Sequence, residues 1–144
     1  MKRPLVEIRH AAVTLEGTLV IRDIAWQLRP GEHWAVLGPN GAGKSTFLRL
    51  VRGDIWPDQS GEGRSVLILD EPCSGLNPAA REGVLRMIET IGRGRTGLVL
   101  VTHHLEDLVP SITHLMLTDG GRIVAQGEKA AMLKDRRLQE LLGP

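Results

Sequence analysis

The most constraining feature of this 144-residue chain is a glycine-rich stretch that follows a short apolar run. The run at 34–37 predicts a strand, and apolar residues at helical spacing begin at Phe47. Glycines at this spacing let the backbone curl so that successive N–H groups face one anion, and a lysine adds positive charge. The stretch predicts a phosphate-binding loop. Its residues are Gly38, Pro39, Asn40, Gly41, Ala42, Gly43, Lys44, Ser45 and Thr46.

A second feature is an aliphatic run at 66–69 that ends in two carboxylates, Asp70 and Glu71. Such a run predicts a buried parallel strand that delivers the acids to the carboxyl edge of a sheet, where α/β proteins bind ligands. Asp70 suits Mg²⁺, directly or through water, and Glu71 suits the polarisation of an attacking water. Taken alone, the run also fits a plain strand before an acidic turn.

The order of these motifs resembles the ATP-binding subunit of ABC-type ATPases, the cassette of ABC transporters. The glycine-rich stretch resembles its Walker A motif, and 66–71 resembles its Walker B motif with the catalytic glutamate. Residues 74–77 resemble its D-loop, and 101–103 resemble its switch-histidine segment. The resemblance covers nearly the whole chain.

The resemblance implies ATP and Mg²⁺ as cofactors, with Lys44 at the phosphates and with Ser45 and Asp70 at the metal. It makes Glu71 and His103 catalytic, with His103 near the γ-phosphate. By itself, His103 also fits a polar residue at the start of a loop.

The chain departs from the family between the two Walker motifs. The family carries a glutamine loop, a helical subdomain and an LSGGQ signature there, and the residues after Phe47 and before 66 are too few for them. Gln59 fits a surface turn better than a glutamine loop, and 60–63 fit a glycine-rich connector better than a signature. The stretch 57–62 resembles the turn that ordinarily follows the phosphate-loop helix.

A further departure concerns adenine, which the family usually stacks on an aromatic side chain before the phosphate loop. The chain has no tyrosine, and Leu15 occupies the matching position. Trp26 and Trp34 lie in strand-like runs and are expected in the core rather than at a base. Binding through the phosphates is therefore expected, with weak base preference.

Length, composition and net charge limit the classes of protein to which this chain can belong. The length predicts one domain, 1–144, and 42% hydrophobic with 24% charged residues is ordinary for a globular protein. A net charge of +1 argues against a nucleic-acid surface. The single cysteine, Cys73, excludes an internal disulfide and is expected to pack rather than react. No apolar run approaches the ~20 residues of a membrane span, so a cytoplasmic location is expected, with membrane association only through a partner.

Alternating strand and helix patterns predict an α/β fold, a P-loop NTPase core with a mainly parallel sheet flanked by helices, N-terminal antiparallel strands and no helical subdomain. Asn77 and Pro78 predict a helix start and Gly92 its end. The remaining expected elements are strands at 5–15, 19–28, 98–101, 112–117 and 123–125, a helical turn at 105–108 and a helix at 128–142.

These features predict an Mg·ATP-binding core whose hydrolysis is weak or absent alone. The expected partners are a second copy or another cassette, and a membrane transport domain by resemblance only. One rival is a working ATPase whose signature comes from another chain. The other is a non-catalytic remnant, natural or engineered, that serves only as a folded scaffold.

Overall fold

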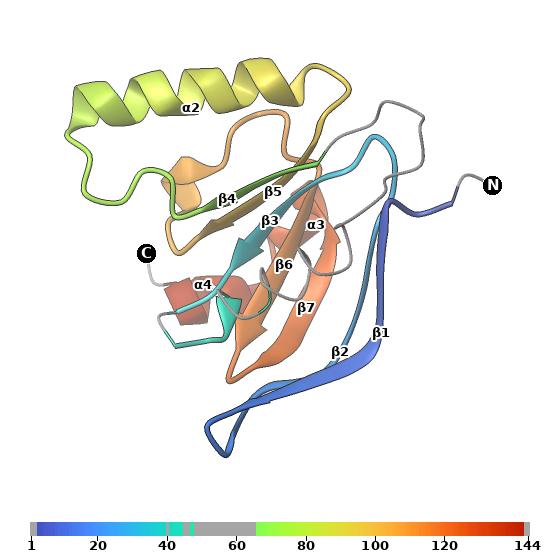
Figure 1. Cartoon of the computed structure of the whole chain (residues 1–144). Coiled ribbons are helices and arrows are strands. Elements are labelled where there is room, and N and C mark those ends of the chain that lie inside the picture. The colour runs from blue at the N-terminus through green and yellow to red at the C-terminus, as the bar shows by residue number, and fades with distance from the viewer. Residues whose placement is uncertain (1–2, 40, 45–46, 48–65, 143–144) are drawn as a thin grey trace.

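The computed structural model describes residues 3–39, 41–44, 47 and 66–142, which form two sheets and several helices (Figure 1). The first sheet is an antiparallel hairpin of β1 (Val6–Leu15) and β2 (Thr18–Leu28). Its turn is made by Glu16 and Gly17, both with positive φ. The two predicted N-terminal strands are therefore confirmed.

The second sheet holds five strands in the order β4-β5-β3-β6-β7. The first four in that order run parallel, and β7 returns antiparallel to β6. The predicted α/β fold with a mainly parallel sheet is confirmed. The strands are β3 (His33–Leu37), β4 (Val66–Asp70), β5 (Gly97–Thr102), β6 (His114–Asp119) and β7 (Arg122–Glu128).

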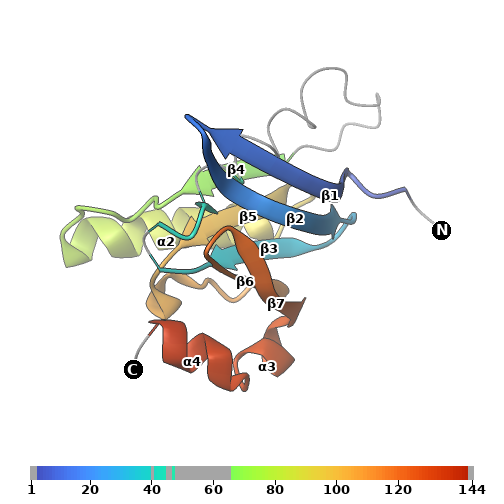
Figure 2. The same cartoon turned by 90° about the horizontal axis from the view of Figure 1, so that it is seen from below.

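The alternation of side chains along β3 explains how this sheet is covered. Trp34 and Val36 belong to one apolar cluster with the β1–β2 hairpin and Phe47. Ala35 and Leu37 belong to a second cluster with the helices. Because successive strand residues point to opposite faces, each face carries its own core. Figure 2 shows the hairpin on one side of the sheet and α3 and α4 on the other.

Helix α2 (Pro78–Gly92) has the predicted bounds. The Asn77 side chain accepts from the Ala80 N–H at 2.8 Å, and Pro78 occupies the first helical position. Asn77 satisfies an N–H that the helix itself cannot pair, and proline has no N–H to lose. The cap and the proline together set the start of the helix.

The predicted single helix at 128–142 is wrong in one respect, because it is broken into α3 (Lys129–Met132) and α4 (Arg136–Leu142). Asp135 lies at the break, where its carboxylate accepts from the backbone N–H of Arg137 at 2.8 Å. A short acidic side chain that bonds local backbone favours a new helix start over continuation.

Smaller differences concern the segment after β5. The predicted helical turn is a 3-10 turn, η1 (Leu105–Asp107). The predicted strand at 112–117 begins later, at His114, because Ile112 closes a turn by donating to the Val109 carbonyl at 3.1 Å. Gln59, the 60–63 connector and the 57–62 turn lie outside the described residues.

Candidate functional site

The glycine-rich loop follows β3 at the carboxyl edge of the parallel strands (Figure 1). Gly41 and Gly43 have φ values of +84° and +91°, a backbone region open mainly to glycine. The Phe47 N–H donates to the Gly43 carbonyl at 2.9 Å, and the Phe47 ring is fully buried. The loop thus curls into a helix start anchored in the core. Asn40, Ser45 and Thr46 lie outside the described residues.

The Lys44 side chain folds over this loop and is 7% exposed. Its Nζ donates to the carbonyl of Gly38 and, at 3.3 Å, to that of Pro39. Burial lowers the pKa of Lys44, while the charges of Glu71 and Asp70 act in the opposite direction. A poorly solvated cation at the base of such a loop attracts an anion strongly.

Glu71 lies between Lys44 and His103, two other residues of the predicted site. Its Oε1 is 2.8 Å from His103 Nδ1 and 3.9 Å from Lys44 Nζ. Its backbone N–H donates to Val101 at 2.8 Å, which continues the pairing of β4 with β5 by one residue. The fold therefore brings Lys44, Glu71 and His103 into one cluster, although they come from three separate strand ends.

Asp70 ends β4 with an exposed side chain, one residue before Glu71. Among the described residues, no group of three or more His, Cys, Asp and Glu side chains could hold a metal ion by itself. Mg²⁺ is usually held by one or two carboxylates together with substrate phosphates and water. Asp70 is a carboxylate that could serve in this way for Mg²⁺ bound together with phosphates.

The turn between β6 and β7 contacts the phosphate loop, and the sequence analysis did not predict this contact. The Gly121 N–H donates to the Ala42 carbonyl at 3.1 Å, and the Gly121 carbonyl accepts from Arg22 at 2.7 Å. Gly121 has a φ of +78°, and a Cβ there would overlap the carbonyl of Val20. This close approach joins the phosphate loop to β2 through one glycine.

Sequence reasoning also missed the buried carboxylate of Asp107. Its Oδ1 accepts two bonds from the Arg81 guanidinium, at 2.6 and 3.0 Å, and its Oδ2 accepts from the Thr102 hydroxyl at 2.8 Å. Arg81 and Asp107 are 26 residues apart, and no local pattern joins them.

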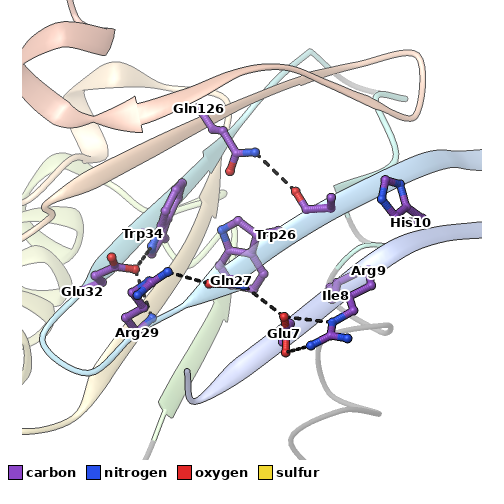
Figure 3. A pocket seen from close by; sticks show the side chains of 11 residues that line it. Glu7, Ile8, Arg9, His10, Trp26, Gln27, Arg29, Glu32, Trp34 and Gln126 are labelled. Atoms are coloured by element: carbon purple, nitrogen blue, oxygen red, sulfur yellow. Dashed lines mark hydrogen bonds and ion pairs between the residues drawn. The ribbon is translucent and has the colours of Figure 1, made fainter. Parts of the chain in front are cut away.

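The predictions for the aromatic residues and the cysteine are confirmed. Trp26 and Trp34 are 3% and 5% exposed and pack edge to face with ring centroids 5.7 Å apart. They are core residues, as predicted, and both also line the cavity shown in Figure 3. Cys73 is buried, and burial raises the pKa of its thiol, which disfavours the reactive thiolate. Leu15 pairs with Thr18 at the hairpin turn.

A cavity of about 440 Å³ lies near the other end of β3, beside its first residues (Figure 3). Its polar walls are largely bonded to one another: Gln27 donates to Glu7 at 3.0 Å, and Arg29 donates to Gln27 at 3.0 Å. The Trp34 indole donates to Glu32 at 2.9 Å. This cavity lies away from Lys44, Glu71 and His103, so the phosphate-loop edge is the better candidate site.

The family model described as "ABC transporter" matches residues 21–64. The ABC transporter ATP-binding protein ModF of Escherichia coli (strain K12) is 23% identical over 222 residues, with 82% of this chain and 45% of that protein covered. The zinc import ATP-binding protein ZnuC of Alcanivorax borkumensis is 47% identical over 60 residues, which cover 42% of this chain and 23% of that protein. The chain thus spans less than half the length of these two relatives.

A putative ABC transporter ATP-binding protein of Streptococcus mutans is 21% identical over 235 residues, with 94% of this chain and 90% of that protein covered. This alignment is longer than the 144 residues of the chain. No helix in the described part of the chain combines the length and apolarity of a membrane span.

Two solved structures have the same fold. A nucleotide-free ATP-binding cassette from an ABC transporter aligns with a TM-score of 0.76 at 13% identity, covering 96% of this chain and 98% of that one. The cbiO1 protein of Clostridium perfringens, part of the ABC transporter complex cbiONQ, aligns with a TM-score of 0.75 at 16% identity, covering 96% and 94%. The chain is thus similar in sequence to ATP-binding proteins of ABC transporters, and it has the fold of their ATP-binding cassettes.

Proposed function

We propose that this protein binds Mg·ATP at the phosphate loop, mainly through the phosphates. The observation that carries the proposal is the cluster of Lys44, Glu71 and His103 at the end of the loop, with Asp70 beside it. The relation to ATP-binding proteins supports the choice of nucleotide. Bound Mg²⁺ would neutralise phosphate charge, with Ser45 and Asp70 as its protein ligands and the loop from Gly38 to Thr46 around the phosphates.

Isothermal titration calorimetry with Mg·ATP and Mg·GTP tests the proposal. We expect similar affinities for the two nucleotides, because the described aromatic rings are buried. Lys44→Ala should remove most of the binding, whereas Lys134→Ala, at an exposed position on the C-terminal segment, should leave it unchanged. Removing Mg²⁺ with a chelator should weaken binding. Unchanged affinity in Lys44→Ala, or a strong preference for adenine, would contradict the proposal.

We further propose that the chain is one truncated domain, 1–144, that lacks the helical subdomain, the glutamine loop and an ordinary signature. The alignment of 235 residues with the Streptococcus mutans protein supports a missing segment, because it exceeds the length of this chain. Glu71 and His103 keep their catalytic roles in this proposal, with Glu71 on the attacking water and His103 toward the γ-phosphate. Hydrolysis by the isolated chain is weak or absent, since signature groups are missing.

The proposed partners follow from the family relation. ATP-binding subunits of this kind act with membrane transport components and dimerise. We propose that a second copy or an intact cassette is the soluble partner and that a transport domain would hold the protein at the membrane from the cytoplasm. No role with nucleic acid is proposed, given the net charge of +1.

The alternative is a folded scaffold without nucleotide binding. The arrangement of Lys44 favours this alternative in one respect, because its ammonium group already has two carbonyl partners in the loop. The same calorimetric titration separates the two functions, since a scaffold gives no heat of binding with either nucleotide.

A further inference from the structure

We propose that Asp107 is a positioning residue that holds Glu71 and His103 in contact by joining the two loops that carry them. The importance of this contact rests on the proposed function, whereas the contact itself is a feature of the fold, with Glu71 Oε1 2.8 Å from His103 Nδ1.

The carboxylate of Asp107 is buried, and both of its oxygens accept hydrogen bonds. Its side chain is 3% exposed, and one oxygen receives both the Nε and Nη2 protons of Arg81, at 3.0 and 2.6 Å. The other oxygen receives the Thr102 hydroxyl at 2.8 Å. Charge-assisted bonds with a guanidinium fork are strong and directional, so both partners are held at defined positions.

The two partners of Asp107 belong to the two loops of the candidate site. Arg81 lies in the first turn of α2, and its backbone N–H donates to the Asn77 carbonyl at 2.9 Å. It therefore fixes the end of the segment that begins at Glu71. Thr102 is the residue before His103, and its hydroxyl oxygen also accepts from the His104 N–H at 3.1 Å. One buried carboxylate thus spans the loops after β4 and β5.

The turn between Glu71 and α2 lies close to the same carboxylate. Burial raises the pKa of the Cys73 thiol, and the charge of Asp107 acts in the same direction, whereas Arg81 acts in the opposite direction. Cys73 is two residues from Glu71 and packs in the protein interior. The Asp107 carboxylate is therefore close enough to this turn for its charge to act on Cys73.

Glu71 needs such support because its backbone conformation is unusual. Its φ is +48°, which few residues other than glycine adopt and which persists only where surrounding contacts fix it. The N–H bond to Val101 fixes one side of Glu71, and the link from Arg81 to Asp107 fixes the segment that follows. Losing that link frees the loop to relax, which separates Glu71 from His103.

The experiment is nucleotide-free NMR of protein with ¹⁵N-labelled histidine, at constant pH. In each background, the ring ¹⁵N chemical shifts of His103 are measured with and without Glu71→Gln. A difference between the two spectra shows that Glu71 contacts His103. His103 is assigned with a His103→Gln variant. We expect this difference in the parent protein and its loss in an Asp107→Asn background. It should persist in Arg86→Gln, which breaks an exposed ion pair with Glu82 on the same helix.

A second pair of variants keeps the test decisive if Asp107→Asn unfolds. Thr102→Ser keeps the hydroxyl and should keep the His103 response, whereas Thr102→Val should lose it. An undiminished response in folded Asp107→Asn or Thr102→Val would overturn the proposal, even if the melting temperature falls, because Asp107 would then only stabilise the fold. Failure of nucleotide binding in calorimetry would leave this outcome unaffected, so the two proposals fail separately.

Discussion

Two neighbouring glycines in the turn beside the phosphate loop differ sharply in whether the surrounding backbone leaves room for a side chain. Gly120 and Gly121 follow one another in the turn after β6, and both have positive φ values. A Cβ on Gly120 meets nothing within 4 Å, whereas one on Gly121 would overlap the carbonyl of Val20. We expect Gly120→Ala to cost about 1–2 kcal/mol in the free energy of unfolding, for the left-handed backbone alone.

Gly121→Ala should cost that amount and about 1–3 kcal/mol more, because overpacking forces backbone to move. It should also weaken nucleotide binding, since Gly121 donates to the loop carbonyl of Ala42. Urea unfolding and calorimetry of the two variants test this. Equal stability of the two variants would show that the turn moves away from Val20 at little cost.

His33 makes a pH-dependent contribution at the residue scale. It is buried, and its Nδ1 accepts from the Leu98 N–H at 3.2 Å, which requires an unprotonated nitrogen. Burial lowers the pKa of His33 below its ordinary 6.5, while the charge of Glu89 and a bond with the Gly92 backbone oppose this. The unfolded chain therefore binds a proton more readily than the folded protein, so stability falls as pH drops below about 6.5.

The lowered pKa of His33 predicts a measurable dependence of stability on pH. The free energy of unfolding should decrease from pH 7.5 to pH 5, and His33→Gln should flatten part of that decrease because it removes the titrating ring. Urea titrations of both proteins at several pH values provide the comparison. Identical slopes for the two proteins would mean that His33 is as easily protonated in the fold as in the unfolded chain.

At the scale of elements, the start of α2 offers a direct test of helix capping. Asn77→Ala removes the acceptor for the Ala80 N–H and should cost about 0.5–2 kcal/mol. Asn77→Asp keeps the acceptor and adds negative charge to a first turn that has no acidic residue, so it should gain about 0.3–1 kcal/mol. Thermal unfolding at low salt measures both, and raised salt should shrink only the gain of Asn77→Asp.

Elements also differ in how far the sequence predicts them. The strand that leads into the loop, the strand at 66–70 and the bounds of α2 follow from local patterns of apolar residues, glycine, asparagine and proline. The prediction that the run at 66–69 is buried is wrong, because β4 lies at the end of the strand order and is only half-buried. The break before α4 does not, because it depends on one Asp135 contact that competes with helix continuation.

The candidate site shows the same division. The loop glycines and Lys44 form a motif that can be recognised in the sequence. His103 becomes a candidate site residue only because it follows Glu71 in the chain. The link from Arg81 to Asp107 is invisible in the sequence because it depends on how β5 and α2 pack. Tertiary contacts between distant polar residues have no local signal, so the supporting groups of the site had to come from the structure.

For the whole molecule, the decisive question is whether the assembled groups suffice for hydrolysis. Glu71 and His103 lie 2.8 Å apart near Lys44, so the two groups that we propose for hydrolysis are close to the phosphate loop. Stabilising a transferring phosphoryl group also needs donors already aimed at the developing charge. In the family resemblance those donors include the signature and the glutamine loop, which the segment after Phe47 is too short to supply.

We therefore expect phosphate release by the isolated chain to stay near background, well below the about 1–100 s⁻¹ typical of kinases. Glu71→Gln should change this release little, because the missing donors already limit the reaction. The measurement is steady-state phosphate release with saturating Mg·ATP, repeated after mixing with an intact cassette. Turnover on mixing that disappears with Glu71→Gln in this chain would show that a partner completes its site. Rapid turnover by this chain alone would contradict the expectation, because the donors would then already be present within its 144 residues.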